Sequence, residues 1–164
     1  MIRPVLKYPH PSLRTTAAEV AEFDESVLEV ARDLVDTMRS HEKCVGLAAP
    51  QIGIPLRMIA VDVSEHPKTT ASHGLVVMVN PVVVAHAGKE VGREGCLSLP
   101  DITANVSRAK RIQFEAFFPD GQPLRSISPG FEARAILHEI DPLDGILILD
   151  RVASPAEVFA RRSR

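Results

Sequence analysis

The sequence lacks a long apolar run. Its longest apolar stretch, residues 74–88, is interrupted by Asn80, Pro81 and His86, whereas a membrane span needs about 20 consecutive apolar residues. The first twelve residues, MIRPVLKYPHPS, contain neither a continuous apolar segment nor a small-residue cleavage site, so they do not have the pattern of a secretory signal. We therefore expect a cytoplasmic protein that does not use a membrane.

There is also no excess of positive charge. The formal net charge at pH 7 is −2, and the one basic cluster, Arg161, Arg162 and Arg164, lies at the C-terminal end. Because nucleic-acid-binding proteins usually carry a concentrated basic face, we expect no specific nucleic-acid partner. We interpret the three terminal arginines as solvent-facing.

Cysteine is scarce as well. Cys44 and Cys96 are the two cysteines of the chain, and without a secretory signal a free thiol or a metal ligand is favoured over a disulfide. What is present is ordinary: 164 residues, 45% hydrophobic and 24% charged, which suits one globular domain with a packed core. We predict a single domain over residues 1–164.

Periodicity predicts an α+β fold. A first helix is predicted from a cap at Asp24 or Ser26 to about Ser40, because apolar residues recur at helical spacing, and a second over 130–140. Ser154 would cap a short C-terminal helix, with Glu157 completing a capping box. The extended segments are predicted at 8–13 (a Pro-rich arm), 56–63, 75–84, 110–127 (two strands around the turn at 119–121) and 145–152, with an exposed loop at 66–74.

Three short segments carry reactive or flexible residues. CVGLAAPQIG (44–53) could be a tight loop, or a place where another chain approaches the backbone with Gln51 as an amide donor. EGCLSLP (94–100) could hold a small buried cysteine, a nucleophile or a thiolate ligand. HEIDPLDG (138–145) begins like a zinc-hydrolase helix, although a lone histidine at a helix end is more often structural.

Taken together, the three segments resemble the signature segments of peptide deformylases, GxGLAAPQ, EGCLS(V/L)P and QHExDHLxG, in the same order and at similar separations. The opening segment, 5–20, and the closing segment, 143–152, also resemble this family. The resemblance implies a fold of mixed or antiparallel sheets around a central metal-site helix, with an N-terminal and a short C-terminal helix. It also implies a hydrolase of bacterial type that removes the formyl group from N-terminal formyl-methionine.

The resemblance assigns the metal and the proton transfer to three residues. Cys96 matches the thiolate ligand, His138 the first imidazole ligand and Glu139 the catalytic acid and base. The metal expected by resemblance is Fe(II), with Zn, Ni or Co as alternatives. Such a ligand set leaves a position open for water, whose pKa the metal lowers.

The resemblance also assigns the substrate contacts. Gln51 and the backbone N–H of Leu97 match the groups that hold the formyl oxygen as it gains charge, and Val45, Gly46 and Gly95 match the substrate-binding backbone, where Val45 and Gly46 pair with the peptide as a strand would. The implied partners are nascent peptides, with proximity to the ribosome and a monomeric state.

Three positions depart from the family pattern. Pro142 stands where the third metal ligand, a histidine, belongs, and its side chain has no donor or acceptor atom. Proline inside a helix also costs about 3 kcal/mol, and it should push Asp141 away from helical geometry. Leu137 replaces a glutamine that would support a ligand. Cys44 replaces the first glycine, as in some branches of the family.

Four interpretations follow from Pro142. The first is a working deformylase with impaired metal binding, in which water, Asp141 or an anion replaces the third ligand. The second is a weak or inactive, metal-free protein that binds formyl-methionyl or related peptides. The third is a thiol hydrolase that uses Cys96 and His138. The fourth is that Pro142 is an engineered or accidental change, since His and Pro codons can differ by one base.

Overall fold

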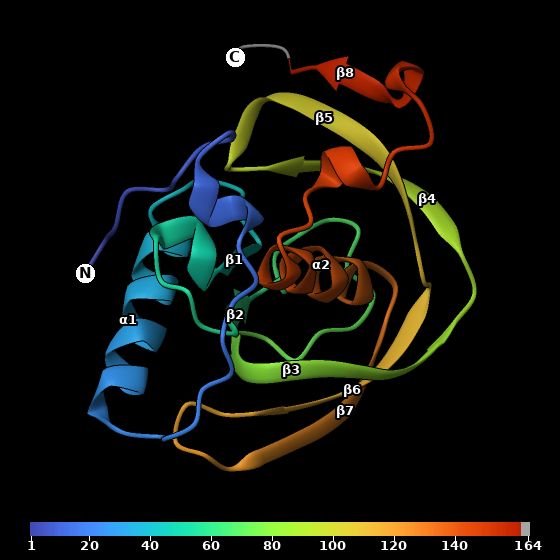
Figure 1. Ribbon diagram of the computed structural model, residues 1–164. Helices are drawn as coiled ribbons and strands as arrows, with labels where there is room; N and C mark the ends of the chain where they lie inside the picture. Colours follow the sequence, from blue (N-terminus) through green and yellow to red (C-terminus); the bar gives the residue numbers. More distant parts are fainter. Residues whose placement is uncertain (162–164) are drawn as a thin grey trace.

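The computed structural model describes residues 1–161. It contains two antiparallel sheets with a helix between them: Figure 1 shows α2 between the curved ribbon of β4 and β5 on one side and β3, β6 and β7 on the other. The strands are β1 (Gly46–Ala48), β2 (Met58–Val61), β3 (Val76–Ala87), β4 (Glu90–Cys96), β5 (Leu99–Arg108), β6 (Arg111–Phe117), β7 (Pro123–Pro129) and β8 (Val158–Ala160).

The edge strands β1 and β4 lie next to the three segments singled out in the sequence. The larger sheet has the order β1-β2-β3-β6-β7 and the smaller one β4-β5-β8, so β1 and β4 are both edge strands. Edge strands present unpaired backbone N–H and C=O groups. Any extended peptide entering between the sheets therefore has two backbone edges to pair with.

The helical elements are two α-helices and five short 3-10 turns. Asp24 caps the first helix by accepting a hydrogen bond from the Ser26 backbone N–H at 3.0 Å, as predicted. The bounds are η1 (Pro11–Arg14), α1 (Glu25–Arg39), η2 (Ala49–Ile52), α2 (Gly130–Ile140), η3 (Asp141–Asp144), η4 (Ile148–Asp150) and η5 (Pro155–Glu157). Within the described residues, no helix combines the length and the apolar character that a bilayer crossing requires.

α2 forms the centre of the core. Ala133, Ala135 and Ile136 on this helix are buried together with residues of β1, β2, β3 and β6. Small alanines allow the sheet to approach the helix closely, and the helix then presents its last turn, with His138 and Glu139, to the space between the two sheets.

The N-terminal arm is ordered, as predicted, but it is not extended throughout, because η1 occupies Pro11–Arg14. Its backbone reaches both loops that carry functional residues. The N–H of Leu6 donates to the Gln51 carbonyl at 2.7 Å, and the N–H of Tyr8 donates to the Ser98 carbonyl at 2.9 Å. The arm thus links the loop after β1 to the loop after β4.

The hairpin predicted at 110–127 is present as β6 and β7, while β4 and β5 were not predicted as strands. The segment 145–152 was predicted as extended, which is wrong: it contains η4, because the Asp150 side chain accepts from the Leu147 N–H at 2.9 Å and closes a turn. The predicted extended segments 56–63 and 75–84 correspond to β2 and β3.

The C-terminal helix is one 3-10 turn, η5, and the chain then extends into β8. Ser154 makes no side-chain cap, and Glu157 accepts a hydrogen bond from the Asn105 amide at 2.8 Å instead of closing a capping box. β8 pairs with β5, for example Thr103 with Phe159. Backbone pairing with an open strand edge outweighs the weak helical preference of this short segment. Arg162 and Arg164 lie outside the described residues.

Candidate active site

The three segments singled out in the sequence meet in one pocket. A cavity of about 900 Å³ opens between the two sheets. It is lined by residues from the α1–β1 connection and β1 (Cys44, Val45, Gly46), from η2 (Gln51), from the end of β4 (Gly95, Cys96, Leu97) and from α2 (His138, Glu139). All residues predicted from the family motifs to bind metal, to act in catalysis or to bind substrate therefore line this pocket.

Gln51 is held so that its amide N–H groups face the thiol. Its Oε1 accepts from the Ala48 backbone N–H at 3.0 Å, which fixes the orientation of the amide. Its Nε2 then donates to Cys96 Sγ at 3.4 Å and to Ser98 Oγ at 3.1 Å. The side chain is 2% exposed, so these donors act in a setting of low dielectric, where a developing negative charge is strongly stabilised.

His138 is oriented by a carboxylate. Its Nδ1 lies 2.7 Å from Glu94 Oε1, which leaves the other ring nitrogen for the pocket. Burial lowers the pKa of His138, but the neighbouring Glu139, Cys96 and Glu94 outweigh it, and the pKa stands well above its usual value. A carboxylate behind a ligating histidine is the usual arrangement at metal sites.

Glu94 also accepts hydrogen bonds from two arginines, the buried Arg108 and the half-buried Arg134. Arg108 donates to both of its oxygens, at 3.0 and 2.9 Å, and Arg134 donates to Oε2 at 2.6 Å. Burial raises the pKa of Glu94, but the hydrogen bonds from His138 and Arg108 outweigh it and hold this pKa well below the usual range. Glu94 is therefore ionised whenever the protein is folded near neutral pH.

Asp141 stays in helical geometry, contrary to the expectation from the proline that follows it. Its φ and ψ are −52° and −48°, and its N–H bonds to the Leu137 carbonyl. The reason is its carboxylate, which accepts from Arg108 at 2.6 Å and from Arg151 at 2.8 and 3.1 Å. These contacts also exclude Asp141 as a replacement ligand, because both of its oxygens are engaged away from the pocket.

Glu139 is buried at the floor of the pocket, 5% exposed. Its Oε1 has no hydrogen-bond partner among the described residues. Its Oε2 lies against Gly46, where an added Cβ would be 2.6 Å away. Burial raises the pKa of Glu139 to about 7, with His138 opposing the shift. A carboxyl group that titrates near neutrality can both accept and release a proton at working pH.

The protein side chains do not complete a metal site. Among residues 1–161, no three His, Cys, Asp or Glu side chains lie close enough together to hold a metal ion. Cys96 and His138 face one another across the pocket floor, but Pro142, which is buried in η3, contributes no atom. Catalytic sites of this type use three protein ligands, so the residues present fit a divalent metal only in part.

Three further positions discussed from the sequence, Leu137, Cys44 and Arg161, lie in different environments. Leu137 is half-buried and packs on the core instead of supporting a ligand. Cys44 donates to the Gly46 carbonyl at 3.2 Å, and burial raises the pKa of its thiol to about 12. Arg161 is exposed, as predicted, but its guanidinium also lies over Gly95 and lines the pocket, which the sequence did not indicate.

The sequence did not indicate the supporting arginines. Arg108 and Arg134 bind Glu94, and Arg151 binds Asp141. Glu94 begins the segment EGCLSLP, and a buried carboxylate requires a partner. That rule predicts an arginine beside Glu94, but it does not say which one, because the partners are up to 40 residues away in the chain.

Comparisons with known proteins agree with these segments. The family model described as polypeptide deformylase matches residues 2–158. The chain is 44% identical over 151 residues to the peptide deformylase of Dictyoglomus thermophilum, covering 92% of this chain and 93% of that protein. It is 39% identical over 167 residues to that of Acidobacterium capsulatum, covering 100% and 95%.

Solved structures give the same result. The fold is similar to a peptide deformylase from Legionella pneumophila, with a TM-score of 0.86, 37% identity and coverage of 96% of this chain and 89% of that chain. It is equally similar to the enzyme from Thermotoga maritima, with a TM-score of 0.85, 34% identity and coverage of 94% and 99%.

Proposed function

Since this chain belongs to the peptide deformylase family, we propose that it removes the formyl group from the N-terminal formyl-methionine of nascent polypeptides, with weakened activity. The observation that carries the proposal is the meeting of Gln51, Cys96, His138 and Glu139 at the floor of one pocket. The reaction adds water to the formyl carbon, breaks its bond to the methionine nitrogen and releases formate and a free amine.

Glu139 has the position and the pKa to move the proton in this reaction. Its unpartnered oxygen can accept a proton from the attacking water and deliver it to the leaving nitrogen. The Gln51 amide, with the Leu97 backbone N–H, would bind the formyl oxygen as it gains negative charge. Both contacts strengthen in the transition state more than in the ground state.

The edge strands support binding of an extended peptide. Gly46 lies in β1 and Gly95 in β4, and each strand has one unpaired backbone edge. Val45 precedes β1 and lines the same pocket. A peptide that pairs with these edges places its N-terminal residue at the pocket floor, in the strand-addition mode of peptide recognition. We infer nascent chains as substrates, a monomeric state, a cytoplasmic location and work close to the ribosome.

The missing ligand sets the expected level of activity. The family is metal-dependent, and we infer Fe(II), with Zn or Ni as alternatives, as the metal that Cys96 and His138 would hold. Two protein ligands hold a divalent metal more weakly than three. We therefore expect purified protein to contain well under one metal ion per chain. A full metal complement by elemental analysis would contradict this.

The experiment that tests the function compares this chain with Pro142→His and with the double variant Pro142→His, Leu137→Gln. Metal content and hydrolysis of a formyl-methionyl tripeptide are measured for each. Asp141 keeps its helical geometry, so a histidine at 142 is expected to restore both quantities. If the metal returns without hydrolysis, the deformylase proposal fails. If neither returns in either variant, Pro142 is not what limits the site.

A second function is favoured by the incomplete ligand set: a metal-free protein that binds formyl-methionyl or related peptides. The pocket lining, the Gln51 amide and the backbone edges do not involve residue 142. Protein treated with a chelator should then bind a formyl-methionyl peptide as tightly as untreated protein. A complete loss of binding after chelation would exclude this function, whereas the first proposal tolerates that result.

A further inference from the structure

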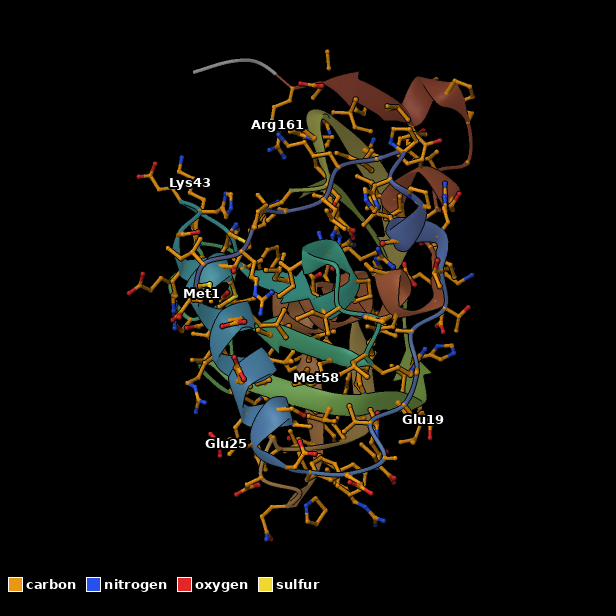
Figure 2. The ribbon with its side chains drawn as sticks, turned by 60° about the vertical axis from the view of Figure 1, so that its left-hand side comes forward. Met1, Glu19, Glu25, Lys43, Met58 and Arg161 are labelled. Carbon is orange, nitrogen blue, oxygen red and sulfur yellow. The ribbon has the colours of Figure 1, made fainter. Side chains whose placement is uncertain are left out.

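Four basic side chains surround the mouth of the pocket. We call Lys43, Lys68, Arg93 and Arg161 the basic rim. All four line the cavity, whose acidic lining residues are Glu42, Glu94 and Glu139. They come from four separate places: the α1–β1 connection, the loop before β3, β4 and the residue after β8. Figure 2 shows Lys43 and Arg161 on the same side of the molecule.

Arg161 is placed in the pocket by the backbone. Its N–H donates to the Asp101 carbonyl at 2.8 Å, which continues the pairing of β8 with β5. Its guanidinium then occupies the space in which a side chain at position 95 would begin. Because residue 95 is glycine, the charge can lie directly over β4, beside one of the two edges available to a peptide.

Residues 1–161 provide no carboxylate partner for the charges of the rim. Within residues 1–161, none of the four has a carboxylate oxygen within 4.0 Å. Arg93 instead contacts the Asn105 amide oxygen at 3.1 Å and lies 3.7 Å from the centroid of the Phe159 ring. The contrast is Arg134 in the same pocket, which is paired with Glu94 at 2.6 Å.

We propose that the basic rim is a specificity subsite for acidic side chains that follow the formylated methionine in the substrate. This rests on the proposed function. An extended peptide advances about 3.3 Å per residue, so the second and third residues after the methionine lie about 7–10 Å beyond it, away from the reacting groups at the floor. Side chains there enter the field of four cations focused in a cleft.

The same geometry makes a basic peptide unfavourable. A lysine at the second or third position after the methionine would face the rim without a carboxylate to separate the like charges, and like-charge contacts oppose binding. Because these charges are exposed, salt should weaken the discrimination, the Debye length being about 10 Å at 0.1 M salt and about 3 Å at 1 M. Selectivity that persists at high salt would come from another source.

The test measures dissociation constants of the full chain for three peptides by fluorescence anisotropy: formyl-Met-Ala-Glu-Glu, formyl-Met-Ala-Gln-Gln and formyl-Met-Ala-Lys-Lys, each labelled at its C-terminus. Binding is measured because it does not require turnover, and all three peptides are compared on the same protein preparation. At 50 mM salt we expect the acidic peptide to bind about tenfold more tightly than the neutral one, and the basic peptide more weakly still. At 500 mM salt the three should converge.

The variants assign the effect to the rim. Arg161→Gln and Lys68→Gln together should reduce the preference for the acidic peptide to about twofold and leave binding of the neutral peptide unchanged. The matched control is Arg125→Gln, an exposed arginine on β7, which should keep the full preference.

Equal binding of the three peptides to the unaltered chain would overturn the inference while leaving the proposed function intact. A preference that survives in the double variant would overturn it too. No binding of any peptide would contradict both proposals.

Discussion

The Nδ1 atom of His138 lies 2.7 Å from Oε1 of Glu94. Glu94 in turn accepts from Arg108, and Arg108 also donates to Asp141. This chain of contacts orients the imidazole without any contribution from residue 142. Replacing Pro142 should therefore leave the orientation of His138 unchanged.

Glu94 should be essential for folding stability. Glu94→Gln removes the charge that Arg108 and Arg134 share in a buried setting, and breaking a buried ion pair costs about 3–5 kcal/mol. Urea unfolding measures the change. The matched control is Glu115→Gln, which touches the exposed Arg125 at 3.5 Å and should change the free energy of unfolding by about 0.5 kcal/mol or less. Equal effects of the two substitutions would contradict this.

Gly46 should tolerate no side chain. An alanine there would bring its Cβ to 2.6 Å from Glu139 Oε2, and both groups are held by packed elements. We expect Gly46→Ala to lower the free energy of unfolding by about 1–3 kcal/mol and to abolish peptide binding. Unchanged peptide binding by Gly46→Ala would show that Glu139 is free to move.

The two cysteines should differ in reactivity. Cys96 lines the pocket beside His138, whereas burial raises the pKa of the Cys44 thiol to about 12 and so disfavours its reactive thiolate form. Iodoacetamide at pH 7.5 should modify Cys96 at least about tenfold faster than Cys44, as followed by peptide mass mapping. If Cys96 reacts no faster than an ordinary thiol, the thiol-hydrolase interpretation is excluded.

Asp33 should link the arm to α1 in a pH-dependent way. Burial raises the pKa of Asp33, but hydrogen bonds from the N-terminal ammonium and Arg3 outweigh it, so the pKa lies below the usual value. A depressed pKa adds stability that is present above the unfolded value of about 3.9 and is lost as the pH falls through the folded value. Asp33→Asn should therefore be less stable by about 1–2 kcal/mol at pH 7.

The same variant should also lose less additional stability than the unaltered chain as the pH falls below about 4. Thermal unfolding at pH 7, 5 and 3 measures both effects. Glu29→Gln, an exposed substitution in the same helix, is the control and should behave like the unaltered chain. Parallel stability curves for Asp33→Asn and the unaltered chain would contradict the assignment.

The sequence predicted those helices and strands that are determined by nearby residues. The N-cap at Asp24 and the bounds of α2 were predicted from capping and helical spacing, and the β6–β7 hairpin from its turn. β4 and β5 were missed because polar residues interrupt their alternation. β8 was read as helix because its stability comes from pairing with β5, a contact about 55 residues away that no local pattern contains.

For the site, the sequence predicted which residues share the pocket but not what holds them. The family motif placed Gln51, Cys96, His138 and Glu139 together, and the structure agrees. The geometry of Asp141 was predicted wrongly because the rule for residues before proline considers the backbone alone, while two distant arginines fix its carboxylate. Arg161 is exposed, as predicted, but its position over Gly95 could not be foreseen because it depends on the pairing of β8 with β5.

The two hydrogen bonds of the N-terminal arm have a consequence for motion. The N–H groups of Leu6 and Tyr8 bind the Gln51 and Ser98 carbonyls, one in η2 and the other between β4 and β5, and the Gln51 amide also donates directly to Ser98. These two segments cannot separate while the arm is bonded to both. Amide hydrogen exchange at residues 6 and 8 therefore reports each separation without any label in the pocket itself.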